Sequence, residues 1–158
     1  MFTAEATYSF SDVAWPPAVR LGLDHPTGDD DIETFSHLFS LAHAYLSFTD
    51  LVGRQNIVDY RLTITAKPHK KVLLRSGIHF LELESKDDGL YSLTGASARP
   101  AADKNDLGVT YDALIKYTIN KHQDIILGYS YFAAGDYIED TGSDEDVDFL
   151  YLQWGYSF

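Results

Sequence analysis

The 158-residue chain contains no cysteine, and no apolar run in it approaches ~18 residues. The first absence excludes disulfides and thiolate metal ligands, and the second excludes a transmembrane helix. Basic residues are also scarce: 12 Lys and Arg stand against 24 Asp and Glu, which gives a formal charge of -12. Such an acidic chain is a poor partner for nucleic acid, whose phosphates attract cations.

The sequence also lacks the motifs of enzymes and metal proteins. No Gly-x-Ser-x-Gly elbow, P-loop or dinucleotide fingerprint occurs, and Ser76 and His79 would face opposite sides of a strand. The acidic runs at 29–31 and 140–146 lack EF-hand spacing, and His37 and His43 are six residues apart rather than the four of a helical zinc pair. We therefore expect no catalytic activity, no metal and no cofactor.

Aromatic residues, in contrast, are abundant at 14% of the chain, with 11 Tyr and 9 Phe. They are concentrated in segments that alternate with a period of two, as a strand with two different faces does. The segment from Val147 to Phe158 shows this most clearly, because Leu150, Leu152, Trp154 and Tyr156 fall on one face. In a soluble sheet that face packs on a core, whereas in an outer-membrane barrel it contacts lipid, with aromatic rings at the headgroups.

Seven such segments are expected as strands, and they are separated by connections of unequal length. The strands are predicted at 2–10, 18–25, 57–67, 72–84, 107–119, 124–138 and 147–158. Short turns and long loops alternate strictly between them, and this sorting is typical of barrels with short periplasmic turns and long extracellular loops. We therefore predict an all-β, antiparallel, up-and-down transmembrane β-barrel, or a segment of one, with seven to eight strands.

The whole chain, 1–158, is expected to form one barrel domain. Residues 26–56 are predicted to be a long extracellular loop with short helices between 32 and 52. Complete bacterial barrels have an even number of strands, so seven strands indicate either a C-terminal part of a larger barrel or an unseen strand, for which 90–97 is the best candidate. No basic segment followed by an apolar one opens the chain, so a membrane protein of this sequence would be a mature or shortened form.

The alternation assigns candidate residues to two faces. The apolar, lipid-facing set is Tyr60, Leu62, Ile64, Tyr111, Ile115, Tyr129, Trp154, Tyr156 and Phe158. The opposite faces carry Arg20, Arg61, Lys67, Arg75 and Lys116, which could form a cationic track for carboxylated sugars. They could equally pair with Glu5, Asp24, Asp59 and Asp112 across strands and fill the interior. Arg54, in the long loop, could line a constriction or cap a loop helix.

Several of these segments resemble the alginate-export family of outer-membrane porins. The resemblance lies in 35–45, 50–61, 85–91, 135–142 and the closing strand, and so extends in order across nearly the whole chain. Family members are longer, with barrels of about eighteen strands, and this chain resembles their C-terminal part. The resemblance implies a porin in the outer membrane of a Gram-negative bacterium that passes anionic polysaccharide or small solutes. Without further strands, seven could not enclose the family's pore.

Two other functions stay open on the sequence alone. The first is a small closed, non-conducting outer-membrane barrel that acts as a structural or binding component of a larger complex with other membrane protein chains. The second is a soluble lipocalin-like binder. The three hypotheses share an all-β fold and differ in which solvent the apolar stripes contact.

Overall fold

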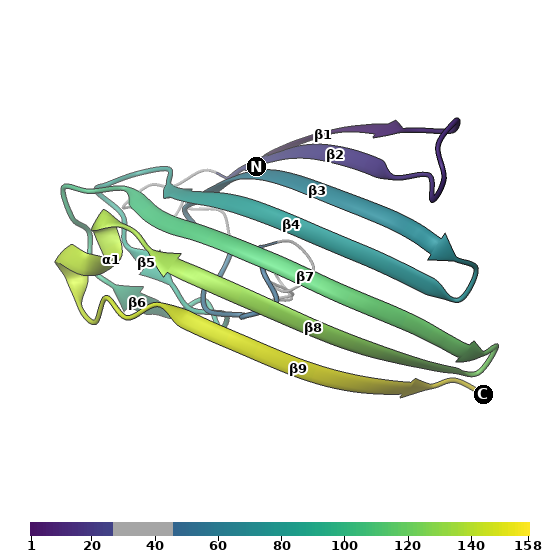
Figure 1. Cartoon of the computed structure of the whole chain (residues 1–158). Coiled ribbons are helices and arrows are strands. Elements are labelled where there is room, and N and C mark those ends of the chain that lie inside the picture. The colour runs from purple at the N-terminus through teal and green to yellow at the C-terminus, as the bar shows by residue number, and fades with distance from the viewer. Residues whose placement is uncertain (27–45) are drawn as a thin grey trace.

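The computed structural model describes residues 1–26 and 46–158 and is dominated by one antiparallel sheet. Its seven strands follow one another in the order β1-β2-β3-β4-β7-β8-β9, each paired with the next along the chain (Figure 1). They are β1 (Phe2–Ser9), β2 (Ala18–His25), β3 (Ile57–His69), β4 (Val72–Leu83), β7 (Asp106–Asn120), β8 (Gln123–Ala134) and β9 (Val147–Tyr156). The seven predicted strands are thus confirmed, and they form an up-and-down meander.

The sheet is open among the described residues. Strands β1 and β9 each have a single neighbour, so the described chain does not close a barrel by itself. The candidate eighth strand at 90–97 does not join the sheet. Instead β5 (Leu90–Tyr91) pairs with β6 (Ser97–Arg99) in a separate two-stranded ladder within the loop that follows β4.

Most predicted strand boundaries agree with the structure to within two residues, but one differs by four. Strand 124–138 was expected to continue through Ile138, but β8 ends at Ala134 and residues Asp136–Thr141 form the helix α1. Gly135 separates the two elements, and Asp136 and Glu139 lie in the first helical turn, where acidic side chains are favourable. Of the loop 26–56, residues 46–56 form turns and contain no helix, and the remainder of the short helices expected at 32–52 lies outside the described residues.

The apolar core is located at the loop end of the sheet rather than along its length. It joins Leu46 and Ile57 to Leu81, Leu83, Leu90, Leu107, Phe132, Tyr137 and Ile138. Tyr137, which is fully buried on α1, receives a hydrogen bond from the amide of Leu90 and donates one to the carbonyl of Pro100. The loops after β2, β4 and β8 are thereby joined into one cap. No helix within the described residues is long and apolar enough to cross a membrane.

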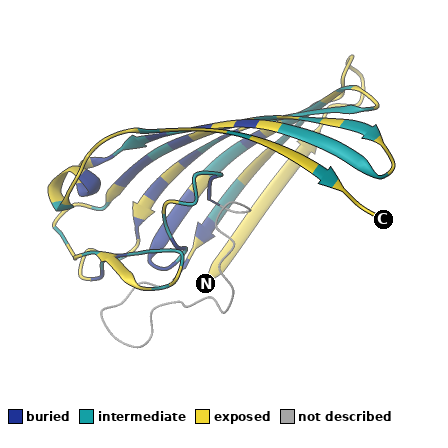
Figure 2. Ribbon diagram, turned by 90° about the horizontal axis from the view of Figure 1, so that it is seen from below, coloured by how far each residue is buried: buried dark blue, intermediate teal, exposed yellow. Residues whose placement is uncertain are grey.

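The sheet is curved, and the loops fold beneath one end of it (Figure 2). We call the side that residues 46–56 contact the inner face and the opposite side the outer face. On β3, Asp59, Arg61, Thr63 and Thr65 belong to the inner face, and Tyr60, Leu62, Ile64 and Ala66 to the outer face. The backbone register carries this division across all seven strands, because paired residues point to the same side.

Candidate functional site

The inner face carries a network of ion pairs centred on Arg61. Arg61 lies on β3, and its guanidinium contacts Glu5 on β1 at 2.7 Å, Asp24 on β2 at 3.1 Å and Asp59 on its own strand at 3.1 Å. The side chains of Asp24, Asp59 and Arg61 are almost completely buried. A guanidinium with five donors in a planar fork suits such multiple carboxylate contacts.

Gly22 explains how Arg61 reaches a carboxylate two strands away. Gly22 is the β2 partner of Arg61 and of Glu5 on β1, so it lies between the two side chains. A Cβ at this position would come within 2.5 Å of Arg61 Nε. The missing side chain therefore lets the guanidinium lie flat across β2, and the glycine in this strand marks a close approach.

Arg54 joins this network from the long loop. Its Nη2 lies 2.9 Å from Asp24 Oδ2, and both side chains are largely buried. Arg54 therefore lies over the inner face with Asp24 as an ion-pair partner. The ion pair also fixes the segment 46–56 to β2.

A second polar chain continues across the sheet from β3 to β8. His79 Nδ1 lies 3.0 Å from Asp59 Oδ1, and His79 Nε2 lies 3.8 Å from Asp112 Oδ2. Asp112 Oδ1 accepts hydrogen bonds from the hydroxyls of Ser130 and of Ser47, the latter at 3.1 Å. All five side chains belong to buried residues, so each polar group requires these partners.

This arrangement is not that of a nucleophilic triad. The hydroxyls of Ser47 and Ser130 bond to a carboxylate and not to the imidazole, whereas a serine nucleophile requires a base such as histidine to take its proton. Within 1–26 and 46–158, no group of three or more His, Asp and Glu side chains is arranged to hold a metal ion.

Phe48 extends the loop into the middle of the inner face. Its ring lies 5.4 Å from the ring of Tyr151 on β9 and 5.7 Å from the guanidinium carbon of Arg75 on β4. The first distance is typical of aromatic pairs and the second of cation–π contacts. Phe48 thus links strands on both sides of β7 and β8, and the loop narrows the space over the sheet.

The ring of Tyr151 lies over Gly128 on the neighbouring strand β8. Gly128 pairs with Tyr151, and a Cβ there would collide with the tyrosine ring. Tyr151 also stacks against Phe149 on its own strand, with ring centroids 5.7 Å apart. The inner face therefore carries its charged side chains mainly on β1 to β4 and β7, and an aromatic pair on β9.

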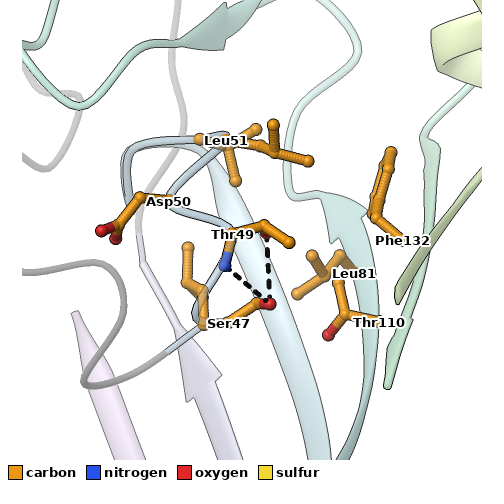
Figure 3. Close-up of a pocket in the computed structure, with 9 residues that line it drawn as sticks. Ser47, Thr49, Asp50, Leu51, Leu81, Thr110 and Phe132 are labelled. Carbon is orange, nitrogen blue, oxygen red and sulfur yellow. Dashed lines mark hydrogen bonds between the residues drawn. The ribbon is translucent and has the colours of Figure 1, made fainter. Parts of the chain in front are cut away.

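Beneath residues 46–52 a small gap of about 10 Å³ remains between the loop and the sheet (Figure 3). Leu81, Thr110 and Phe132 line it from the sheet, and Thr49 and Leu51 line it from the loop. The side chain of Asp50 points away from the sheet residues in the same view. A space of this size holds at most about one water molecule, so the gap reflects close packing of the loop rather than a ligand site.

The remaining predicted cations differ in their surroundings. Arg20 lies on the inner face, 3.9 Å from Glu5, with both side chains about half exposed. Lys116 pairs with Asp124 on β8 at 3.2 Å. Lys67 is exposed near the short turn after β3. Cross-strand pairing, which the sequence left open, is therefore present for Arg20, Arg61 and Lys116. Phe48, Ser47 and Tyr151 were missed because only the register and the loop path bring them into the site.

The outer face contains the strand residues expected to contact lipid, and Phe158 lies just beyond the end of β9. Tyr60, Ile64, Tyr111, Ile115, Tyr129, Trp154, Tyr156 and Phe158 are exposed, and Leu62 is partly buried. On β7, Tyr111 and Tyr117 bracket Ala113 and Ile115, and six residues of strand span about 20 Å. Exposed apolar side chains this extensive are unusual for a monomeric soluble protein.

The architecture defines an all-β antiparallel meander with a polar, ion-paired inner face, an apolar outer face and an unpaired edge on each side. A family model described as alginate export matches residues 1–150, and the chain belongs to this family. The resemblance noted in the sequence is thereby confirmed. A search of curated proteins finds no match.

Proposed function

We propose that this chain forms part of the wall of a β-barrel in the bacterial outer membrane, through which anionic polysaccharide or small anionic solutes pass. The observation that carries the proposal is the division between the two faces. The outer face exposes Tyr60, Ile64, Ile115 and Leu152, while Asp59, Arg61 and Asp112 are buried on the inner face. A soluble lipocalin-like binder would place its apolar stripes inside, so the exposed outer face argues against it.

The open edges support a further part of the proposal. Strands β1 and β9 present unpaired backbone groups, which in lipid must be satisfied by neighbouring strands. The barrel is therefore completed by strands outside this sequence, either from the same polypeptide or from other membrane protein chains. The whole-protein assignment, namely a porin related to alginate export, rests on the family match together with this geometry.

In this proposal the solute moves passively and no catalytic step is involved. Arg61 and Arg54 are held in ion pairs and shape the inner wall, so they are poor candidates for solute contact. Arg75 lies against Phe48, where the loop narrows the inner space, and is the better candidate for contact with an anion.

A second candidate function is a non-conducting barrel that serves as a structural or binding component. The observation that favours it is the occupancy of the inner face, since residues 46–56, the ion pairs and Phe48 fill much of it. A lumen packed with side chains gives a plug rather than a pore.

Three measurements test these proposals. Recovery in the outer-membrane fraction and heat-modifiable gel migration are expected for the barrel, and extraction without detergent would contradict it. Single-channel recording in planar bilayers then separates the two functions. In the barrel closed by its further strands, anion-selective conductance supports passage, with selectivity reduced by Arg75→Ala, and a folded, membrane-inserted barrel with no conductance supports the non-conducting function.

A further inference from the structure

We propose that the turn between β1 and β2 is a membrane anchor, which lies in the headgroup layer of a zwitterionic phospholipid leaflet with Trp15 as its main contact. This inference goes beyond the proposed function and rests on it. The turn comprises residues 11–16 and is closed by a hydrogen bond of 3.0 Å from the Phe10 amide to the Pro17 carbonyl. It lies at the same end of the sheet as the two other short turns (Figure 1).

The turn exposes large apolar side chains, whereas turns in water usually carry polar ones. Trp15 is 61% exposed, and Val13 is exposed beside it in the turn. Leaving apolar surface of this kind in water is unfavourable in proportion to its area. The turn is therefore suited to a nonpolar or amphipathic neighbour.

The two other short turns have the opposite character. Each consists of two residues between its strands, Lys70 and Lys71 in one turn and Lys121 and His122 in the other. Their ammonium groups suit water, while Asp12 is the only charged residue of the first turn. A carboxylate can pair with the ammonium group of a zwitterionic headgroup, and a turn without cations has no attraction to anionic lipid. The apolar composition thus belongs to the first turn and is not a general property of this end of the sheet.

The apolar surface of the turn continues that of the outer face. Tyr8 shares a row with Val19 and Ile64 on this face, and Phe10 follows two residues later on the same side. The rings of Tyr8 and Phe10 meet edge to face, with centroids 4.8 Å apart, and both are exposed. The chain then enters the turn that carries Trp15. An indole, with its apolar ring and single N–H donor, is most favourable at the boundary between acyl chains and headgroups.

The backbone presents Trp15 at a conformational cost. Its φ of 59° lies in the left-handed region, which is unfavourable for a bulky residue. The next two residues, Pro16 and Pro17, have φ fixed by their rings, so they limit the movement of the turn. Strain of this kind at an exposed aromatic residue is characteristic of contact positions, and a turn held in place loses little freedom when it enters an interface.

The test uses tryptophan fluorescence, because the chain contains only Trp15 and Trp154 and each can be observed alone. The full chain is folded into phosphatidylcholine vesicles whose acyl chains carry bromine atoms close to the headgroups, where they quench tryptophans that touch them. In Trp154→Phe, we expect the brominated lipid to quench Trp15 at least half as strongly as it quenches Trp154 in Trp15→Phe. Iodide added to the water should quench Trp15 only weakly.

The matched control is Lys121→Trp in a chain that also carries Trp15→Phe and Trp154→Phe. This tryptophan lies in the exposed turn between β7 and β8, so iodide should quench it and the brominated lipid should not. An equal response of Trp15 and of the control to the two quenchers would overturn the anchor and indicate a turn that faces water or another protein. Trp154 distinguishes the two proposals. Lipid quenching of Trp154 without quenching of Trp15 rejects the anchor and keeps the lipid-facing outer face, and absence of lipid quenching at both rejects the proposed function as well.

Discussion

In a soluble domain the covered face of a sheet is apolar and the exposed face is polar. In this seven-stranded sheet the covered face is polar and the exposed face is apolar. The outer face is exposed, yet its side chains are mainly apolar. Between the rows of aromatic residues near the two ends of the sheet, the only polar side chain that β3, β4, β7 and β9 carry on this face is the hydroxyl of Ser76. The inner face is largely covered, yet it holds Asp59, His79 and Asp112. Hydrophobicity alone therefore does not tell which face of this sheet is protected from water.

The side chains of the two faces therefore need different surroundings. Buried charges on the inner face require partners, and they find them across strands and from the loop 46–56. Apolar groups on the outer face require only a nonpolar solvent. The predictions below test this difference at both faces and then at the loop cap.

Replacing Arg61 with methionine should have the largest effect on stability. The substitution leaves Asp24 and Asp59 buried without their common partner, and removal of one member of a buried pair destabilises by about 3–5 kcal/mol. Urea unfolding in micelles or liposomes measures the change. The control is Lys116→Met, whose pair with Asp124 is about one-third exposed and should contribute less than about 1 kcal/mol. Equal effects of the two substitutions would mean that the inner network is not buried.

Replacing Ile115 with arginine tests the outer face directly. Its side chain is 49% exposed, so in water the change should alter stability by no more than about 0.5 kcal/mol. Against acyl chains the same change should destabilise by about 2–4 kcal/mol near the bilayer midplane. Unfolding from liposomes gives the difference, and Leu114→Arg, one residue along β7 on the inner face, is the control. A similar response at both positions would remove the distinction between the faces.

Most of the sheet could be predicted from the sequence because the alternation of side chains along each strand indicates a polar environment on one side and an apolar one on the other. The alternation of Tyr60, Leu62 and Ile64 with Arg61 and Thr63 is local and has a period of two. The short turns are equally local, so strand order followed from a simple meander. The boundary after Ala134 was wrong because Tyr137 and Ile138 continue the apolar content of β8, although they are buried on a helix.

The site was predicted less completely because its contacts join residues distant in sequence. Ser47 bonds to Asp112, 65 residues away, and no periodicity indicates that the loop returns to the sheet. Gly22 and Gly128 did carry a signal, since a glycine inside a strand indicates close approach of another group. That signal becomes readable only when the register places Arg61 and Tyr151 beside them.

Replacing Asn56, in the cap that holds the loop on the inner face, should have an intermediate effect on stability. Its backbone φ is 57°, and its amide donates to the carbonyls of Ser85, Asp88 and Gly89 while its oxygen accepts from the Ser85 amide. Asn56→Asp keeps the shape but removes the donors, which should destabilise by about 1–3 kcal/mol. Hydrogen exchange at residues 85–89 should accelerate, whereas Thr94→Val, on an exposed hydroxyl of the same loop, should leave exchange unchanged.

The smallest effect is expected at Asp146, where the loop after α1 meets β9. Hydrogen bonds from the Tyr131 hydroxyl and the Ala134 amide lower the pKa of this carboxyl below its usual value of 3.8. Since the folded pKa is depressed, the ionised group contributes to stability above the unfolded pKa, and the contribution is lost as pH falls through the folded pKa. The Ala134 amide should therefore exchange more slowly at neutral pH, where the ionised Asp146 accepts its hydrogen bond, and should lose this extra protection in acid. In Asp146→Asn this pH dependence should disappear, and its persistence in the variant would assign it to another group.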